Sequence, residues 1–525
     1  MAEQELLLVI ESGLEKGPPL APEPPKSLPA ARLKGIDRNQ DYWGAVAIEE
    51  LIPADHLARA IWEVTGKLDF SGFLKNNKSV EGKQGRERWD PRLLASVWVY
   101  AYSQGIGAAR EIERQMEHEP GMRWLTGNGK VNYHSLSDFR VDHGEAVEKL
   151  FCELLGMLSR EGLLDLSEVT QDGTKIRAAG GGSSLRRDKT LQEHIREAEE
   201  AVRKLSQAEE AERVLSRKEA AQKRAAEERK ARLEQAVKEL EEIRKSPSKR
   251  KKAEEARVSE TEPEARVMKD GQGGYGLSYN VQTTTETKYG LLVSVGITQQ
   301  GNDNYQLDPA MDRMEKQAGQ KPSRVLVDGG FINAKTIEKM EEKKIELVGP
   351  EVAVEKIQAR NEQQSLAQAG IAKEFGQQSF VIIEDGKAMR CPAGNRMGRT
   401  QIEKRYTAYQ ASRKDCQGCM HRAQCCPKSG ARIVKIKKEN KVVKAYQERM
   451  REEATKAIYR KRGPVAEFPH AWIKEKLGLR KFHVRGLIKA GLEVLWVAMT
   501  YDIQQWVRLR FRQSAVALAV AEATA

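Results

Sequence analysis

The stretch VTQDGTKIRA, residues 169–178, places an acidic residue where a charge is costly. Its β-branched residues predict a strand. Side chains of a strand alternate between two faces, so Asp172 shares a face with Thr174 and Ile176, and no Lys or Arg accompanies it there. A carboxylate on a half-buried face needs a charged partner or a metal ion. Asp172 therefore either has a charged partner from another part of the chain or faces a metal ion.

A second acid follows a predicted buried strand. The apolar run 325–327 is typical of a strand covered on both faces, and Asp328 ends this run before two glycines. Ligands of open α/β sheets gather at the carboxyl ends of strands, which makes Asp328 a candidate site residue. An ordinary Asp-Gly turn is the alternative interpretation.

A third acid, Glu467, lies in the basic stretch YRKRGPVAEFPHAWIKEKLGLRKF. Glu467 and Lys474 are seven residues apart, so they share a face if this segment is helical. The acid is either part of a surface ion pair, which contributes little, or a metal ligand beside cations that bind phosphate. The basic residues Arg480, Lys481 and Arg485 follow closely, either as phosphate contacts or as a solvated loop.

Three carboxylates from distant parts of the chain suit one kind of chemistry. Mg²⁺ prefers oxygen ligands and takes only a few carboxylates besides water and phosphate. Two such ions, about 3.5–4 Å apart, can activate an oxygen nucleophile and stabilise the leaving oxygen of a phosphodiester.

The cysteines suggest a separate metal site. Cys416 and Cys419 form a C-x2-C pair, and Cys391 and Cys425 complete four thiolates for a tetrahedral Zn²⁺ site. Cys426 and His421 are substitute ligands. A set of reduced, unligated thiols is the alternative.

The elements that must position these residues predict an α/β fold. Strand patterns at residues 164–184 and 262–350 give three strands in a meander, then strand–helix–strand. Residues 185–261 are rich in Ala, Glu, Lys and Arg without Gly, and predict a charged helical insertion resembling a coiled coil. A second insertion, residues 351–450, carries the cysteines. Residues 451–510 return to the core with the third acid, and 511–525 form a tail.

The N-terminal part has a different pattern. Residues 1–40 are Pro-rich and predict a flexible or extended arm. Residues 41–163 predict a helical domain, including a helix at 91–116 that Asp90 caps. The segment HSLSDFRVDH, with His134, Ser135, Ser137 and Arg140 expected to be exposed, is either the reading end of a DNA-binding helix-turn-helix or part of an ordinary packing domain.

The amino-acid composition indicates which class of partner the protein binds and where it is located. The 525 residues carry a net charge of +13, with a pI near 9.2, which favours a polyanionic partner such as nucleic acid. No apolar stretch approaches the roughly 20 residues that span a bilayer, and the N-terminus carries acids instead of the basic residues of a signal peptide. We therefore expect a cytoplasmic protein, associated with the nucleoid.

The motifs DGTKIRA, EPEARVMK, YGLSYNVQ and VLVDGGF, followed by Y-x2-R-x4-E-x6-K, occur in one order along residues 45–500. This combination resembles bacterial insertion-sequence transposases of the DDE type, and more narrowly those with a Tyr-Arg-Glu-Lys signature around the third acid. The signature falls on Tyr459, Arg462, Glu467 and Lys474.

The resemblance implies a ribonuclease-H-like (retroviral-integrase-like) core and a catalytic triad of Asp172, Asp328 and Glu467. Asp172 would bridge two Mg²⁺ or Mn²⁺ ions, and each of the other acids would complete one. The implied activity is cleavage of DNA at the ends of the element and strand transfer into target DNA, without a nucleotide cofactor. The implied DNA contacts are Tyr459, Arg460, Arg462, Lys474, Arg480, Lys481, Arg485 and Arg140.

The same resemblance implies a structural zinc knuckle and terminal inverted repeats as the DNA partner. Two element ends also suggest a homodimer or a larger assembly on DNA. Two other functions stay open. One is a two-metal nuclease that cuts without joining, and the other is a non-catalytic protein that binds terminal repeats.

Overall fold

The protein is described by a computed structural model. The residues that it describes are 47–75, 88–210, 217–245, 250–270, 273–402, 406–437 and 440–524. Internal contacts divide the chain into Met1–Ala47 and Ile48–Ala525, and everything below concerns the second unit. The arm predicted for residues 1–40 lies outside the described residues. In the described part, no helix has the length and apolar character that crossing a membrane requires.

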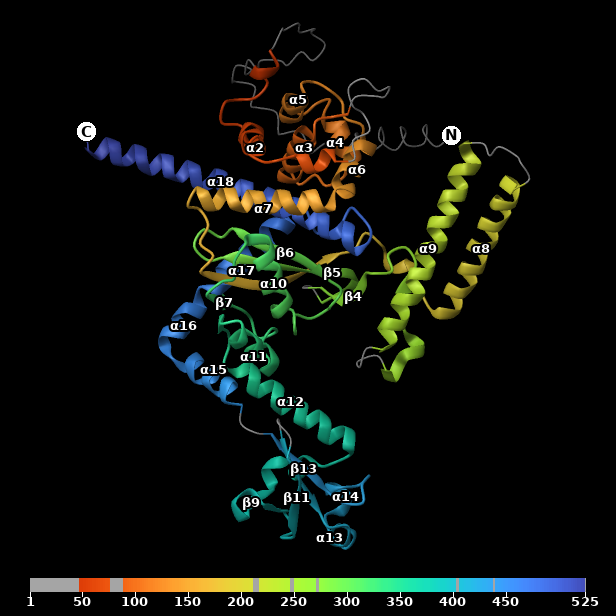
Figure 1. Cartoon of the computed structure of the whole chain (residues 1–525), viewed down its shortest axis with the longest axis vertical. Helices are drawn as coiled ribbons and strands as arrows, with labels where there is room; N and C mark the ends of the chain where they lie inside the picture. The colour runs from red at the N-terminus through yellow and green to blue at the C-terminus, as the bar shows by residue number, and fades with distance from the viewer. Residues whose placement is uncertain are drawn as a thin grey trace, which may run out of the picture. The chain divides into compact units, whose positions relative to one another are not determined.

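A mixed six-stranded sheet forms the centre of the fold (Figure 1). Its strands are β1 (Glu168–Arg177), β4 (Arg266–Lys269), β5 (Tyr275–Glu286), β6 (Leu292–Thr298), β7 (Arg324–Leu326) and β8 (Glu346–Val348). The order is β4-β5-β1-β7-β8, and β6 also pairs with β5. Strands β1, β4, β5 and β6 pair antiparallel, whereas β7 and β8 run parallel to β1. The meander and the following strand–helix–strand unit were both predicted from the sequence.

The β5–β6 hairpin shows how the sequence builds the sheet. Buried Glu286 ends β5, and its carboxylate accepts hydrogen bonds from the backbone N–H groups of Lys288, Tyr289 and Leu291. The carboxylate thus satisfies the donors of the turn, which would otherwise be left unpaired. The hairpin was expected at Thr287-Lys288, and this prediction is confirmed.

Helices cover both faces of the sheet. Neighbouring residues of β6, Leu292 and Val293, enter two different apolar clusters, as strand alternation requires. One cluster contains α10 (Leu307–Ala318), α11 (Ala334–Glu342) and α15 (Lys441–Arg451) with β7 and β8. Helix α15 thus packs with the core, although the sequence analysis assigned it to the insertion 351–450. Helices α16 (Glu453–Arg460) and α17 (Arg462–Glu475) follow.

The other cluster joins the sheet to the N-terminal helices. These elements are η1 (Ile48–Glu50), α2 (Leu57–Thr65), η2 (Ser71–Leu74), α3 (Pro91–Ser103), α4 (Ala109–Gln115), α5 (Pro120–Thr126), α6 (Tyr133–Asp142) and α7 (Gly144–Arg160). Asp90 caps α3 as predicted, but the helix expected to reach residue 116 ends at Ser103, because Gly105 adopts φ +74°. The C-terminal helix α18 (Leu487–Thr524) packs against α3, α7 and β6.

The prediction that Arg140 is exposed is wrong, and its role as a DNA contact is not supported by its position. Its side chain is buried in α6 and donates hydrogen bonds to the Tyr102 hydroxyl and the Gly107 carbonyl. It also lies 3.6 Å from the carboxylate of buried Glu493 in α18. Arg140 is therefore an internal ion-pair partner, which a helical pattern alone cannot distinguish from a surface arginine.

The predicted helical insertion is an antiparallel hairpin of α8 (Asp188–Glu210) and α9 (Arg217–Lys245), followed by η4 (Arg250–Glu255) (Figure 1). The hairpin has its own small apolar cluster, with Leu191, Leu233 and Leu240. At its base lie η3 (Gly182–Ser184), β2 (Leu185–Arg186) and β3 (Val258–Ser259), and β2 pairs with β3. The chain therefore leaves and re-enters the core at one point.

The cysteine-containing insertion has a sheet of its own, in the order β13-β12-β11-β10-β9. Its elements are α12 (Val352–Ala369), η5 (Lys373–Phe375), η6 (Gln377–Ser379), β9 (Val381–Ile383), η7 (Glu384–Gly386), β10 (Ala388–Arg390), β11 (Arg396–Ile402), β12 (Tyr406–Ala411), α13 (Arg413–Gln417), α14 (Arg422–Cys425) and β13 (Ile433–Lys437). The sequence analysis predicted a small cysteine-rich segment here, but not this sheet.

Candidate active site

The sheet brings two of the predicted acids close to each other. Strands β1 and β7 are parallel neighbours, and their last paired residues are Thr170 and Leu326. Asp172 follows two residues later on β1, and Asp328 follows two residues past the end of β7. The two carboxylates lie near each other, since the charge of Asp328 contributes to the raised pKa of Asp172. Asp328 is partly buried, and its carboxylate accepts a hydrogen bond of 2.8 Å from the backbone N–H of Gly330.

The side chain of Asp172 is only 16% exposed. No basic residue accompanies it on its face of β1, but α17 supplies one, since Arg462 Nη2 lies 3.1 Å from Asp172 Oδ2. The backbone N–H of Gly173 donates to Oδ1 at 2.8 Å. Burial nevertheless raises the pKa of Asp172 to about 6, and the negative charges of Asp328 and Asp303 act in the same direction. The loss of contact with water therefore outweighs the stabilisation that Arg462 gives to the ionised carboxylate.

Helix α17 lines the site with three nitrogen-bearing side chains, from Arg462, His470 and Lys474. His470 Nδ1 lies 3.8 Å from Asp172 Oδ2, and its Nε2 lies 2.7 Å from the Thr283 hydroxyl. Burial lowers the pKa of His470 to about 3, and the charges of Lys474 and Arg462 add to this effect, so the imidazole is neutral near pH 7. Burial also lowers the pKa of Lys474.

Glu467 is not gathered with the other two acids. It is exposed on α17, and the described residues make no hydrogen bond or ion pair with its carboxylate. Within the described ranges, no three His, Cys, Asp or Glu side chains stand close enough together to hold a metal ion. The role of Glu467 as the third acid thus stays a prediction.

The other predicted DNA contacts fall into two groups. Tyr459 is half-buried near the acids, since the charges of Asp328 and Asp172 raise its pKa in addition to burial. Arg460 is exposed and lies 2.7 Å from Glu453. The exposed residues Arg480, Lys481 and Arg485 follow α17, and the Arg480 carbonyl accepts a hydrogen bond from the backbone N–H of Arg177 at the end of β1.

The sequence analysis missed one acid of this site. Asp303 lies in the loop after β6, and its Oδ1 accepts hydrogen bonds from Asn280 at 2.8 Å and Gln282 at 2.7 Å. A Cβ atom at Gly173 would lie 2.2 Å from the same oxygen. The glycine after Asp172 is therefore required by the close approach of Asp303. Alternation along β5 places Asn280 and Gln282 on one face, but only the structure shows which loop they hold.

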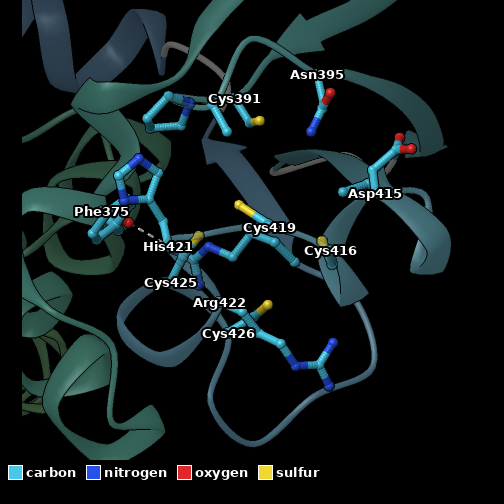
Figure 2. A pocket seen from close by; sticks show the side chains of 14 residues that line it. Phe375, Cys391, Asn395, Asp415, Cys416, Cys419, His421, Arg422, Cys425 and Cys426 are labelled. Carbon is cyan, nitrogen blue, oxygen red and sulfur yellow. Dashed lines mark hydrogen bonds between the residues drawn. The ribbon is translucent and has the colours of Figure 1, made fainter.

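A second cluster lies in the cysteine-containing insertion, where five cysteines line one cavity of about 20 Å³ (Figure 2). These are Cys391, Cys416, Cys419, Cys425 and Cys426. Burial raises the pKa of Cys425 to about 11, and the nearby thiols of Cys426, Cys416 and Cys391 act in the same direction. His421, Arg422 and Arg432 also line this cavity. The five thiols thus line one cavity, but in the described structure no three of them stand in a metal-binding arrangement, so the zinc site stays a prediction.

Two family models match the chain. A transposase domain (DUF772) matches residues 46–142, which hold the helices from η1 to α6. A transposase DDE domain matches residues 390–507, which hold most of the cysteine-lined cavity, α17 and the buried part of α18. No curated protein and no solved structure gives a significant match to the chain.

Both matched families are transposases, and they confirm the resemblance to insertion-sequence transposases of the DDE type. The matched segment of the DDE domain includes Glu467, whereas Asp172 and Asp328 lie outside both matched segments. The narrower Tyr-Arg-Glu-Lys signature stays a prediction.

Proposed function

We propose that this chain cuts DNA strands at the ends of a mobile element and joins them to target DNA in a reaction that depends on Mg²⁺ or Mn²⁺. The observation that carries this proposal is the proximity of Asp172, on β1, to Asp328, which follows the end of the parallel neighbour β7. The strand order supports a ribonuclease-H-like core, since three antiparallel strands, β6-β5-β1, continue into the parallel strands β7 and β8.

The residues present suit a hard divalent cation. Asp172 and Asp328 offer oxygen ligands, and Asp172 is desolvated, so a cation beside it would stabilise its ionised form. These two acids would hold the cation, with Glu467 as the third ligand. The bound ion would supply an activated water and stabilise the leaving oxygen.

The side chains around the acids have roles of their own. Arg462 Nε is buried without a hydrogen-bond partner among the described residues, so it has a donor free for a phosphate oxygen. Lys474, held in a partly desolvated position, would bind a second phosphate oxygen as a point charge. Neutral His470 would hold its hydrogen bond to Thr283 and so keep α17 in place against β5.

The test is cleavage and joining of labelled DNA that carries the element's flanking inverted repeats, with Mg²⁺ present. We expect Asp172→Ala, Asp328→Ala and Glu467→Ala each to lower the cleavage rate at least about 1000-fold, because loss of a ligand removes metal-assisted catalysis. Asp138→Ala, at an exposed position of α6, is the matched control and should retain the rate. Metal-dependent cleavage that survives one of the three substitutions removes that residue from the triad.

One observation favours a second candidate function, a non-catalytic protein that binds terminal repeats. Glu467 is exposed, and Arg462 already pairs with Asp172. Such a protein would bind the repeats without any response to Mg²⁺. The same assay separates the candidates, because cut ends identify a nuclease and joined products identify a transposase.

We further propose that the cysteine cavity binds one structural Zn²⁺ ion through Cys391, Cys416, Cys419 and Cys425. The donor set suits zinc, and the cavity of about 20 Å³ has room for one small ion. Four thiolates around Zn²⁺ leave a net negative charge. Arg422 and Arg432, which each bury one unpaired guanidinium nitrogen in the described structure, would balance it.

Metal analysis of the purified protein tests the zinc proposal. We expect one zinc per chain and its loss, with a lower melting temperature, in Cys416→Ser. Cys152→Ser is the matched control, since Cys152 lies in α7 away from the cavity, and it should keep the metal. A protein without stoichiometric zinc would contradict the proposal.

The partners follow from the same proposal. Double-stranded DNA would contact the exposed residues Arg480, Lys481 and Arg485, which follow α17, together with Arg460. A homodimer or larger assembly would hold two element ends, and its stoichiometry on DNA can be measured by light scattering.

A further inference from the structure

The segment that holds the cysteine cavity carries a large excess of positive charge. Residues 370–437 contain 14 Lys and Arg but five Asp and Glu, an excess of nine, whereas the whole chain has a net charge of +13. The segment is the five-stranded sheet with α13 and α14, in which the cysteine cavity lies. Residues 438–510, which follow it, carry the same excess, with 17 Lys and Arg against eight Asp and Glu. In that segment, however, several of the basic side chains form ion pairs, namely those of Arg449, Arg451, Arg460, Arg462 and Arg480.

This segment has its own apolar core. Met389, Met397, Tyr409 and Val434 are buried together with Cys416 and Cys426, each from a different element or turn of the segment. The core buries only part of the apolar residues of the segment, since Val381, Ile382, Ile402, Met420 and Ile433 are exposed, and it uses few of the basic ones. The excess of basic residues therefore needs a separate explanation.

Most of the described basic side chains are exposed, whereas Arg422 and Arg432 line the cysteine cavity. Lys387, Arg390, Arg413 and Lys414 are all exposed, and among the described residues none of them has an acidic group within ion-pair distance. Arg396 is the exception, since it pairs with Glu384. Unpaired like charges on a small module repel one another, so they lower its stability unless a polyanion binds.

Size determines how these charges act. A compact chain of this length has a radius of gyration of about 11 Å, close to the Debye length of about 8 Å at physiological ionic strength. The charges therefore act together on a nearby polyanion, and duplex DNA carries one negative charge per about 1.7 Å of its axis.

We propose that residues 370–437 form a module that binds the phosphate backbone of duplex DNA. The inference rests on the proposed function and assigns this insertion a share of its substrate binding.

The experiment compares two charge-matched variants of the full chain. The module variant carries Lys387→Gln, Arg390→Gln, Arg413→Gln and Lys414→Gln. The control variant carries Lys189→Gln, Arg196→Gln, Arg203→Gln and Lys238→Gln, four exposed positions of the α8–α9 hairpin. Binding to a fluorescent 30-bp duplex of arbitrary sequence is measured by anisotropy across a salt series. Zinc content and melting temperature verify that both variants are folded.

We expect the module variant to lose about 10- to 100-fold in affinity and to show a shallower dependence of log K on log salt, by about 0.9 for each lost phosphate contact. The control variant should keep the wild-type affinity and slope. Equal losses in both variants, or no loss in the module variant, overturn the inference while wild-type binding leaves the proposed function intact. If the wild-type chain itself does not bind the duplex, the proposed function falls as well.

Discussion

At the scale of single residues, Asp172 is costly to the fold. Its pKa of about 6, against an ordinary value of 3.8, corresponds to roughly 3 kcal/mol. The folded chain binds this proton more tightly than the unfolded chain, so the unliganded fold gains stability as pH falls from about 6 toward 3.8 and loses it as pH rises through that window. A cation bound at this site would offset the free-energy cost, because it stabilises the ionised carboxylate.

The same pKa predicts a pH dependence. A cation competes with the proton on Asp172, so the Mg²⁺-dependent cleavage rate should rise as pH increases through about 6. Arg462→Gln removes the charge that holds this pKa down, and we expect the acid limb of the pH–rate profile to move to higher pH. Arg460→Gln, whose exposed side chain pairs with Glu453, should leave the midpoint in place. Identical midpoints in all three proteins would show that Asp172 does not set the profile.

Sequence reasoning identified Asp172, Asp328 and Arg462 because each stands at a recognisable point of a pattern: on a strand face, after a buried strand, or in the basic signature. It missed Asp303 and His470. Asp303 lies in an irregular loop, and its position depends on two amides of β5. His470 is significant only because α17 packs against β1 and β5, and a one-dimensional pattern does not contain that contact.

At the scale of elements, the position of β1 requires a glycine at residue 173. Gly173→Ala would place a methyl group 2.2 Å from the Asp303 carboxylate and 2.5 Å from the Gln282 amide. We expect a loss of about 1–3 kcal/mol in the free energy of unfolding and a matching loss of cleavage, since the strand would move Asp172. Gly182→Ala, with open space around it, is the matched control. Denaturant titration of both variants measures the difference, and equal stabilities would contradict the close approach.

Most elements of the core were predictable, because their periodicity is strong and their ends carry clear turn or cap signals. The five-stranded sheet of the insertion was not. Its strands are short and rich in exposed Arg and Lys, and β11 contains an irregularity between Arg399 and Gln401 that disrupts the alternation. Tertiary packing and the cysteine cavity hold these strands, and neither is visible as a local pattern.

At the scale of the whole molecule, one apolar cluster joins the N-terminal helices, the sheet and α18. Within it, fully buried Glu493 accepts hydrogen bonds from Tyr102 and His483 and lies beside Arg140. Three parts of the chain that are far apart in sequence therefore depend on one charged group. The helical region and the catalytic core should unfold together.

This dependence is testable. Arg140→Ala leaves Glu493 buried without its cation, and we expect a loss of about 3–5 kcal/mol in the free energy of unfolding. Arg160→Ala, at an exposed position at the end of α7, should change it by less than about 0.5 kcal/mol. At low temperature, where the variant stays folded, the salt dependence of duplex binding should match the wild type. A changed slope of log K against log salt would indicate that Arg140 contributes to DNA binding.

The pairing of Leu185 with Ser259 gives the α8–α9 hairpin a narrow attachment. Because the chain departs and returns at almost the same place, a segment there can lengthen, shrink or be exchanged over generations without shifting β1 against β5. Natural variation can therefore act on this appendage independently of the chemistry beneath it. A difference in size between two such enzymes at this point is then no measure of how far their reactions have diverged.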